Sequence, residues 1–131
     1  MHILLVEDDE SLYNLYSTEF DLNGHTVVWH KVGTGVVDRI KKEKPDAILL
    51  DIMLPEKTGL EILKDIKANK DVNNIPVIML TNFGNEENVS MALELGALDY
   101  LMKYKITPSE MKDRLSTLLG QSTGSGVKLT S

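Results

Sequence analysis

Five short, largely apolar runs recur along this chain, and segments with helical periodicity separate them. The runs span residues 3–6, 26–30, 47–50, 77–80 and 98–102. Short apolar strands that alternate with helices are typical of repeated βα units around a parallel sheet. We therefore expect an α/β fold with five such units, in which helices cover both faces of a doubly wound, open parallel sheet.

The segments between the runs carry the signals of helices. Two of them place apolar side chains at helical spacing, with Leu12, Leu15, Tyr16 and Phe20 in the first and Leu60, Leu63 and Ile66 in the second. Thr58 and Thr107 each have a glutamate three residues later, which is the spacing of a capping box. Gly96 stands where a left-handed residue would end a further helix, and residues 36–44 predict a shorter one.

The length and the composition favour one cytoplasmic domain. The chain has 131 residues, which is enough for a single hydrophobic core, and its formal charge of −6 argues against direct binding to nucleic acid. It has no cysteine, which excludes disulfides, thiolate nucleophiles and cysteine-based zinc sites. No apolar run approaches the ~20 residues that cross a membrane. We expect a domain of residues 1–119, followed at 120–131 by a flexible tail or a linker stub.

Polar side chains follow four of the five runs. Glu7 and Asp8 follow the first run, Asp51 the third, Thr81 the fourth and Lys103 the fifth. Because the carboxyl ends of parallel strands meet at one edge of a sheet, these groups should converge in one crevice. Carboxylates without a neighbouring histidine or cysteine are ligands that suit Mg²⁺. The sequence therefore predicts a magnesium site in that crevice.

Asp51 is the candidate for covalent chemistry. Carboxylates attack phosphorus to give aspartyl phosphates, and phosphoryl transfer depends mostly on positioning and on neutralising the equatorial oxygens. Mg²⁺, the Thr81 hydroxyl and the Lys103 ammonium would each meet one of those oxygens. Any one of these residues at a strand end is ordinary, because strands end at solvent. The ordered set on four strands of one sheet is what indicates phosphoryl chemistry.

Four short motifs give the chain a resemblance to a known family. They are Val6-Glu7-Asp8, Asp51-Ile52-Met53-Leu54-Pro55 with Gly59 following, Leu80-Thr81, and Asp99-Tyr100-Leu101-Met102-Lys103. With them, residues 2–119 resemble the receiver domain of two-component response regulators. The resemblance implies the flavodoxin-like fold of the chemotaxis response regulator, with strand order 2-1-3-4-5. It further implies a phosphoprotein of signal transduction, not an enzyme, that assists its own phosphorylation and dephosphorylation.

The resemblance also implies a role for each matching position. Asp51 matches the phosphoacceptor. The Mg²⁺ ligands are matched by Glu7, Asp8, Asp51 and the Met53 carbonyl. Thr81 and Lys103 match the pair that binds the phosphoryl group, and Thr81 and Tyr100 match the switch. Asp9 falls outside the matched acidic pair and is expected at the start of the first helix. The implied donor is a histidine kinase or a phosphotransfer protein that docks beside the first helix. The implied recipient is a downstream protein or an output domain, and dimerisation through the fourth and fifth helices is left open.

Two positions depart from the family pattern. Lys103 is followed by Tyr104 where receivers usually have proline, and Thr81 is followed by Asn82 where a small residue is usual. The first departure predicts a different loop before the last helix. The second predicts narrower access to the site and an altered rate of phosphoryl gain or hydrolysis.

Three other functions compete with this interpretation. A phosphatase of the haloacid dehalogenase type needs a second aspartate two residues after the nucleophile, and Met53 stands there. A nucleotide- or flavin-binding domain needs a glycine-rich loop where residues 6–9 are acidic. A pseudo-receiver that acts only as a protein-interaction module keeps the fold without the chemistry, and it is the main alternative.

Overall fold

The computed structural model describes residues 1–82 and 86–120, apart from the side chain of Glu86, so the expected tail at 121–131 lies outside the described residues. The strands are β1 (His2–Val6), β2 (Thr26–His30), β3 (Ala47–Asp51), β4 (Val77–Thr81) and β5 (Asp99–Met102). The helices are α1 (Glu10–Leu22), α2 (Val36–Glu43), α3 (Gly59–Ala68), α4 (Glu86–Glu94) and α5 (Pro108–Leu118). No helix in the described ranges combines the length and the apolar character of a membrane span.

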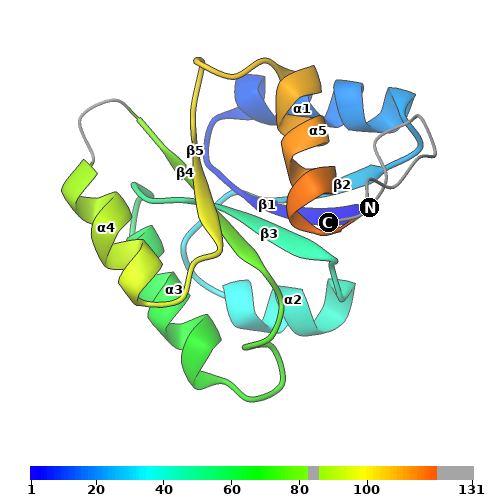
Figure 1. Ribbon diagram of the computed structural model, residues 1–131. Coiled ribbons are helices and arrows are strands. Elements are labelled where there is room, and N and C mark those ends of the chain that lie inside the picture. The colour runs from blue at the N-terminus through cyan, green and yellow to red at the C-terminus, as the bar shows by residue number, and fades with distance from the viewer. Residues whose placement is uncertain (83–85, 121–131) are drawn as a thin grey trace.

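The five strands form one parallel sheet in the order β2-β1-β3-β4-β5. This order confirms the expected flavodoxin-like α/β fold, with β2 and β5 at the edges (Figure 1). β3 and β4 each extend one residue beyond the predicted apolar run, so their last residues still belong to the ladder. Asp51 pairs with Leu80, and Thr81 pairs with Met102. The register therefore fixes Asp51 and Thr81 at the carboxyl edge of the sheet.

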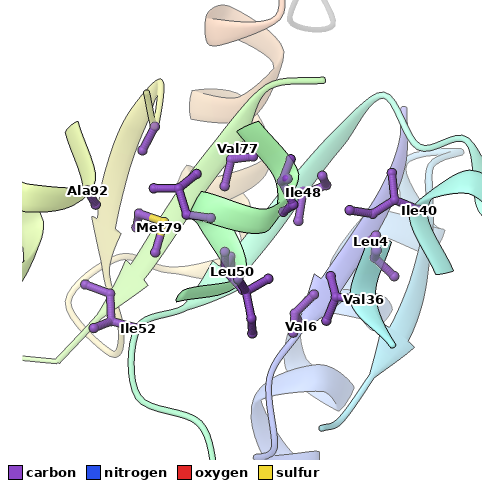
Figure 2. Close-up of a cluster of buried hydrophobic side chains, with 14 of the residues drawn as sticks. Leu4, Val6, Val36, Ile40, Ile48, Leu50, Ile52, Val77, Met79 and Ala92 are labelled. Atoms are coloured by element: carbon purple, nitrogen blue, oxygen red, sulfur yellow. The ribbon is translucent and has the colours of Figure 1, made fainter. Parts of the chain in front are cut away.

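Helices cover both faces of the sheet, with α2, α3 and α4 on one face and α1 and α5 on the other (Figure 1). Successive residues of a strand point to opposite faces. β3 accordingly supplies Ile48 and Leu50 to one hydrophobic core and Ala47 and Leu49 to the other. Figure 2 shows the first core, in which side chains of β1, β3 and β4 meet those of α2 and α4. Burial on both faces removes the central strands β1, β3 and β4 from water almost completely, whereas the edge strands β2 and β5 stay partly exposed.

The helix ends follow the signals in the sequence. Asp9 is the N-cap of α1, as expected, and its carboxylate accepts two backbone N–H groups of the first turn. The capping boxes predicted at Thr58 and Thr107 are both formed. Gly96, with φ of 110°, follows the end of α4. Its N–H and that of the next residue bond back to carbonyl oxygens of the last turn, which is the Schellman arrangement.

The apolar stripe that indicated a helix in this segment is confirmed by α1, but not all of its residues are buried. Leu12, Tyr16 and Phe20 are buried against the sheet, whereas Leu15 is 50% exposed. The three buried residues are spaced four apart and share one face of the helix, so Leu15 lies at the margin of that face. It lines a cavity of about 260 Å³ together with Tyr104.

Candidate functional site

Three ionisable side chains are buried together at the carboxyl edge of the sheet. Asp51 ends β3, Glu7 directly follows β1, and Lys103 directly follows β5. The Lys103 Nζ lies 2.6 Å from Glu7 Oε1 and 2.9 Å from Asp51 Oδ2. None of the three residues is more than 9% exposed. Buried charges are tolerated when they are paired, and here one ammonium group pairs with two carboxyl groups.

The sheet and one close backbone contact set these positions. The Lys103 N–H donates to the Thr81 carbonyl oxygen at 2.8 Å, so the β4–β5 ladder continues past the end of β5. Gly59, the first residue of α3, lies against the backbone of Asp51. A Cβ atom at position 59 would come within 2.2 Å of the Asp51 carbonyl oxygen. Glycine is therefore required where α3 begins, and its small size keeps the end of β3 close to this helix.

Both oxygens of the Asp51 carboxylate have a donor. The Met53 N–H donates to Oδ1 at 3.2 Å, and the Lys103 ammonium lies on Oδ2. The carboxylate is thus oriented from two sides before any ligand binds. The Met53 side chain is 55% exposed, so this residue approaches Asp51 through its backbone. The role of the Met53 carbonyl as a metal ligand stays a prediction.

The buried cluster shifts the pKa values of two of its members. Burial, and after it the hydrogen bond to Asp51, raises the pKa of Glu7 to about 8, against the opposing effect of Lys103. Burial lowers the pKa of Lys103, but its hydrogen bonds to Glu7 and Asp51 outweigh that effect and leave this pKa raised. Without a metal ion, the raised pKa favours the protonated form of Glu7, because a proton on this group relieves the repulsion between two adjacent carboxyl groups.

Three carboxyl groups are arranged to hold a divalent cation. Oxygen atoms of Glu7, Asp8 and Asp51 lie within 4.8 Å of one another. Asp8 is exposed, so the group is open to solvent on that side. Carboxylate oxygens without a nitrogen or sulfur ligand suit Mg²⁺, which keeps several waters beside one or two carboxylates. The donor set therefore fits a Mg²⁺ site.

The two residues predicted as a switch line a single cavity next to α4. Thr81 is buried, and its hydroxyl donates to the Asn82 carbonyl oxygen at 3.1 Å. The cavity has a volume of about 270 Å³ and is lined by Thr81, Asn82, Val89, Ser90, Leu93, Tyr100 and Met102. Tyr100 lies on the edge strand β5 and is 41% exposed. The structure thus provides free volume between the predicted phosphoryl-binding hydroxyl and the predicted switch ring.

The loop after Lys103 makes a contact that proline could not provide. Tyr104 has a left-handed backbone conformation, with φ of 63°, which the proline ring forbids. Its hydroxyl donates to Asp9 Oδ2 at 2.6 Å. This hydrogen bond lowers the pKa of Asp9 and raises that of Tyr104. Because Asp9 also caps α1, the bond ties the loop after β5 to the start of α1.

The sequence analysis did not predict the environment of three aromatic residues around the cluster. The Trp29 indole N–H donates to the Glu7 carbonyl oxygen at 2.6 Å, and Tyr104 reaches Asp9 across 95 positions of the chain. The Tyr16 hydroxyl is buried and has no hydrogen-bond partner among the described residues. Burial and then the nearby Glu7 raise the pKa of Tyr16. No sequence signal marks these contacts, because aromatic residues at such positions are ordinarily core residues.

Comparison with known proteins identifies the family of this chain. Residues 3–116 match the family described as the response regulator receiver domain. The chain belongs to this family. Receiver domains are signal-transduction domains of two-component systems and not classical enzymes, and histidine kinases are their partners.

The receiver domain has relatives of about twice its length. It is 35% identical over 120 residues to the alkaline phosphatase synthesis transcriptional regulatory protein PhoP of Bacillus subtilis (strain 168), covering 92% of this chain and 49% of that protein. It is 35% identical over 128 residues to the phosphate regulon transcriptional regulatory protein PhoB of Pseudomonas aeruginosa, covering 95% of this chain and 53% of that protein. The chain thus spans about half the length of the curated relatives that it matches.

Solved structures support the same assignment. The BeF3-activated N-terminal receiver domain of Klebsiella pneumoniae RstA has a TM-score of 0.82 to this domain at 33% sequence identity. The match covers 92% of this chain and 100% of the RstA receiver domain. The similarity therefore extends over the whole receiver fold.

Proposed function

We propose that this receiver domain accepts a phosphoryl group on Asp51 in a Mg²⁺-dependent reaction, and that phosphorylation alters a partner-binding face. The observation that carries the proposal is the Lys103 ammonium, held 2.9 Å from Asp51 Oδ2 and 2.6 Å from Glu7 Oε1. A buried cation beside a carboxylate prepares the site for additional negative charge. A phosphoryl group on Asp51 brings that charge.

The donor in this proposal is a phosphohistidine of a histidine kinase or of a phosphotransfer protein. A carboxylate oxygen of Asp51 attacks phosphorus, the P–N bond breaks, and the imidazole leaves with the electron pair of that bond. Lys103 and the Thr81 hydroxyl each contact one equatorial oxygen of the transferring group. Mg²⁺, when bound, supplies positive charge to that group. The protein itself mainly positions the reacting atoms and neutralises their charge.

The ligands that would hold Mg²⁺ are Glu7, Asp8, Asp51 and the Met53 carbonyl. The donor set supports this assignment, since the three carboxyl groups place oxygens within 4.8 Å of one another. Because the pKa of Glu7 is raised to about 8, its carboxyl group loses a proton when the cation binds. Cation binding therefore competes with protons at neutral pH and strengthens as the pH rises.

The switch in this proposal consists of Thr81 and Tyr100. In the unphosphorylated domain the Thr81 hydroxyl donates to a neutral carbonyl oxygen. A phosphoryl group on Asp51 is a charged acceptor and a stronger partner for that hydroxyl. As the hydroxyl turns toward it, the cavity of about 270 Å³ leaves room for the Tyr100 ring to move inward. The face formed by α4, β5 and α5 then changes shape, and a bias of about 2 kcal/mol is enough to change the dominant state.

The first helix is the proposed docking site for the donor. Leu15 is 50% exposed and lines the cavity of about 260 Å³ beside Tyr104. Leu15→Arg should therefore slow transfer from a protein donor and leave the reaction with a small phosphodonor unchanged. Leu12→Arg gives no comparable test, because Leu12 is 1% exposed and a buried arginine would disrupt the fold. Unchanged transfer to the folded Leu15→Arg protein would contradict docking at α1.

The partners on the output side belong to the same proposal. The relatives are about twice as long as this chain, which supports an output domain or a separate downstream protein as the recipient of the signal. We place the receiver domain at residues 1–119, in the cytoplasm, with α4 and α5 as a candidate surface for a homodimer. Sedimentation with and without phosphorylation tests the dimer, which should form only in the phosphorylated protein.

Intact mass spectrometry tests the central step. The protein is incubated with acetyl phosphate or phosphoramidate, with and without Mg²⁺. We expect one phosphoryl adduct that requires Mg²⁺ and is absent from Asp51→Asn. Asp21→Asn is the matched control, since Asp21 is an exposed carboxylate in α1 and its loss should leave the adduct unchanged. A folded wild type without an adduct would favour the pseudo-receiver, and Asn82 and Tyr104 would then be the first residues to exchange.

A further inference from the structure

The only tryptophan of the chain lies beside the charged cluster and has no part in the chemistry described above. Trp29 is partly buried in the edge strand β2. Its backbone pairs with Leu5, but its side chain extends further along β1. The indole N–H donates to the carbonyl oxygen of Glu7, one residue past the end of β1, at 2.6 Å. An aromatic side chain therefore binds the backbone where the strand gives way to the acidic pair.

The carbonyl bound by Trp29 belongs to the peptide that joins Glu7 to Asp8. The other end of this peptide is also held, because the Asp8 N–H donates to Glu7 Oε2 at 3.2 Å. The preceding peptide is anchored to β2, since the Glu7 N–H donates to the His30 carbonyl oxygen at 3.1 Å. The orientation of the peptide between the two acidic residues thus depends on the indole N–H at one end and on a carboxyl oxygen at the other.

The indole ring is itself held in place. It stacks on the ring of Tyr13 in α1, with centroids 4.7 Å apart and planes inclined by 6°. The Lys31 ammonium lies 5.1 Å from the centroid of the Trp29 ring, which is within the range of a cation–π contact. Contacts from α1 and from the end of β2 therefore fix the direction of the N–H before any ion binds.

We propose that Trp29 is a positioning residue for the divalent-cation site. Its N–H orients the Glu7–Asp8 peptide and, through it, the carboxyl groups on both sides. The inference rests on the proposed Mg²⁺ site. A peptide without this restraint can rotate, and a bound cation would then have to order it, which weakens binding. Loss of the N–H should weaken Mg²⁺ binding about fivefold to tenfold.

The test removes the N–H and keeps the ring. Because Trp29 is the only tryptophan, expression in a tryptophan auxotroph supplied with 3-benzothienylalanine changes this position alone. Sulfur then replaces the N–H in a ring of nearly the same shape. Isothermal titration calorimetry with Mg²⁺, at a pH above the pKa of Glu7, measures the dissociation constant. We expect this constant to rise about fivefold to tenfold, while the melting temperature of the metal-free protein falls by only the few degrees, about 2–6 °C, that the loss of one hydrogen bond costs.

Tyr13→Phe is the matched control, because it alters the stacked neighbour but keeps its ring and the indole N–H. It should leave the Mg²⁺ dissociation constant within about twofold of the wild type. Unchanged Mg²⁺ binding by the analogue would overturn the inference, as would an equal loss in Tyr13→Phe, which would assign the effect to a general disturbance of the stacked pair. If the unaltered protein bound no Mg²⁺, the proposed site itself would fail and the inference with it.

Discussion

The charged cluster and the edge of the sheet at β5 lie next to each other but are built in opposite ways. In the cluster, Glu7, Asp51 and Lys103 are almost fully buried and bound to one another. At the edge, Tyr100 is 41% exposed beside a cavity of about 270 Å³. The buried contacts of the Lys103 ammonium with Asp51 and Glu7 hold the proposed reacting groups in one geometry, whereas the neighbouring surface has room to rearrange. A switch requires both properties, and here they belong to separate sets of residues.

Loss of the buried cation should have the largest effect. Lys103→Met keeps the length of the side chain but leaves Glu7 and Asp51 without a positive partner. We expect the free energy of unfolding of the Mg²⁺-free protein to fall by about 3–5 kcal/mol near pH 8. Tyr100→Leu at the open edge is the control and should change it by at most about 0.5 kcal/mol. Urea unfolding measures both, and equal losses would mean that the two regions do not differ in this way.

The proton on Glu7 should make the free energy of unfolding depend on pH, and this dependence should arise in the cluster and not at the open edge. The pKa of Glu7 is about 8 in the folded, Mg²⁺-free protein and 4.5 in a free side chain. The folded state therefore binds more protons between these values. The stability from this group is complete below pH 4.5 and is lost as the pH rises through 8.

Unfolding measured across this pH window tests the contribution of Glu7. Glu7 alone should change the free energy of unfolding by at most about 1.4 kcal/mol for each pH unit. Glu7→Gln cannot release a proton and should remove this part of the slope. A slope that is the same in Glu7→Gln and in the wild type would show that Glu7 does not titrate in this range.

Thr81 borders the cavity and should connect the two regions. Thr81→Ala removes the hydroxyl from the phosphoryl group, so we expect adduct formation to slow by about tenfold to a hundredfold. Tyr100 should then stay exposed in the phosphorylated protein, which fluorine NMR of fluorotyrosine-labelled protein can detect. Thr81→Ser keeps the hydroxyl and should retain the rate and the movement of the ring. If Tyr100 still moved inward in phosphorylated Thr81→Ala, the movement of its ring would not depend on the Thr81 hydroxyl.

The hydrogen bond between Tyr104 and Asp9 should give the smallest effect, because it lies at the surface. Tyr104→Phe is expected to lower the free energy of unfolding by about 0.5 kcal/mol. The pKa of Asp9 should rise toward its usual value, since the bond to Tyr104 is the main cause of its lowering. NMR titration of the Asp9 carboxyl group measures this change. A pKa of Asp9 that does not move would show that the hydrogen bond is absent in solution.

The fold could be predicted because local patterns agree with the global architecture. Alternating apolar runs and helical segments indicated the βα units, and capping boxes at Thr58 and Thr107 located two helix starts. The positions of Asp51 and Lys103 followed from the rule that carboxyl ends of parallel strands meet at one edge. The strand order did not follow from these patterns, since periodicity carries no information on which strands are neighbours. It came from the resemblance to receiver domains.

The contacts around the site could not be predicted in the same way. Trp29 reaches Glu7, and Tyr104 reaches Asp9, only after the sheet and α1 have been assembled. Such contacts depend on side-chain rotamers and on the packing of elements that are distant in sequence. The exposure of Leu15 could not be predicted for a related reason, because helical spacing alone does not show how wide a face the sheet covers.

One backbone hydrogen bond, from the Lys103 N–H to the Thr81 carbonyl oxygen, joins the residue with the buried cation to a residue that lines the cavity. In the proposed switch, a change of charge at Asp51 acts on Lys103, and a single hydrogen bond of the β-ladder connects Lys103 to the residue that borders the cavity. A rearrangement of the helices then follows from the signal and is not needed to carry it from Asp51 to the cavity. In this proposal, the parallel sheet is both the scaffold of the domain and a direct connection between the phosphorylated residue and the partner-binding face.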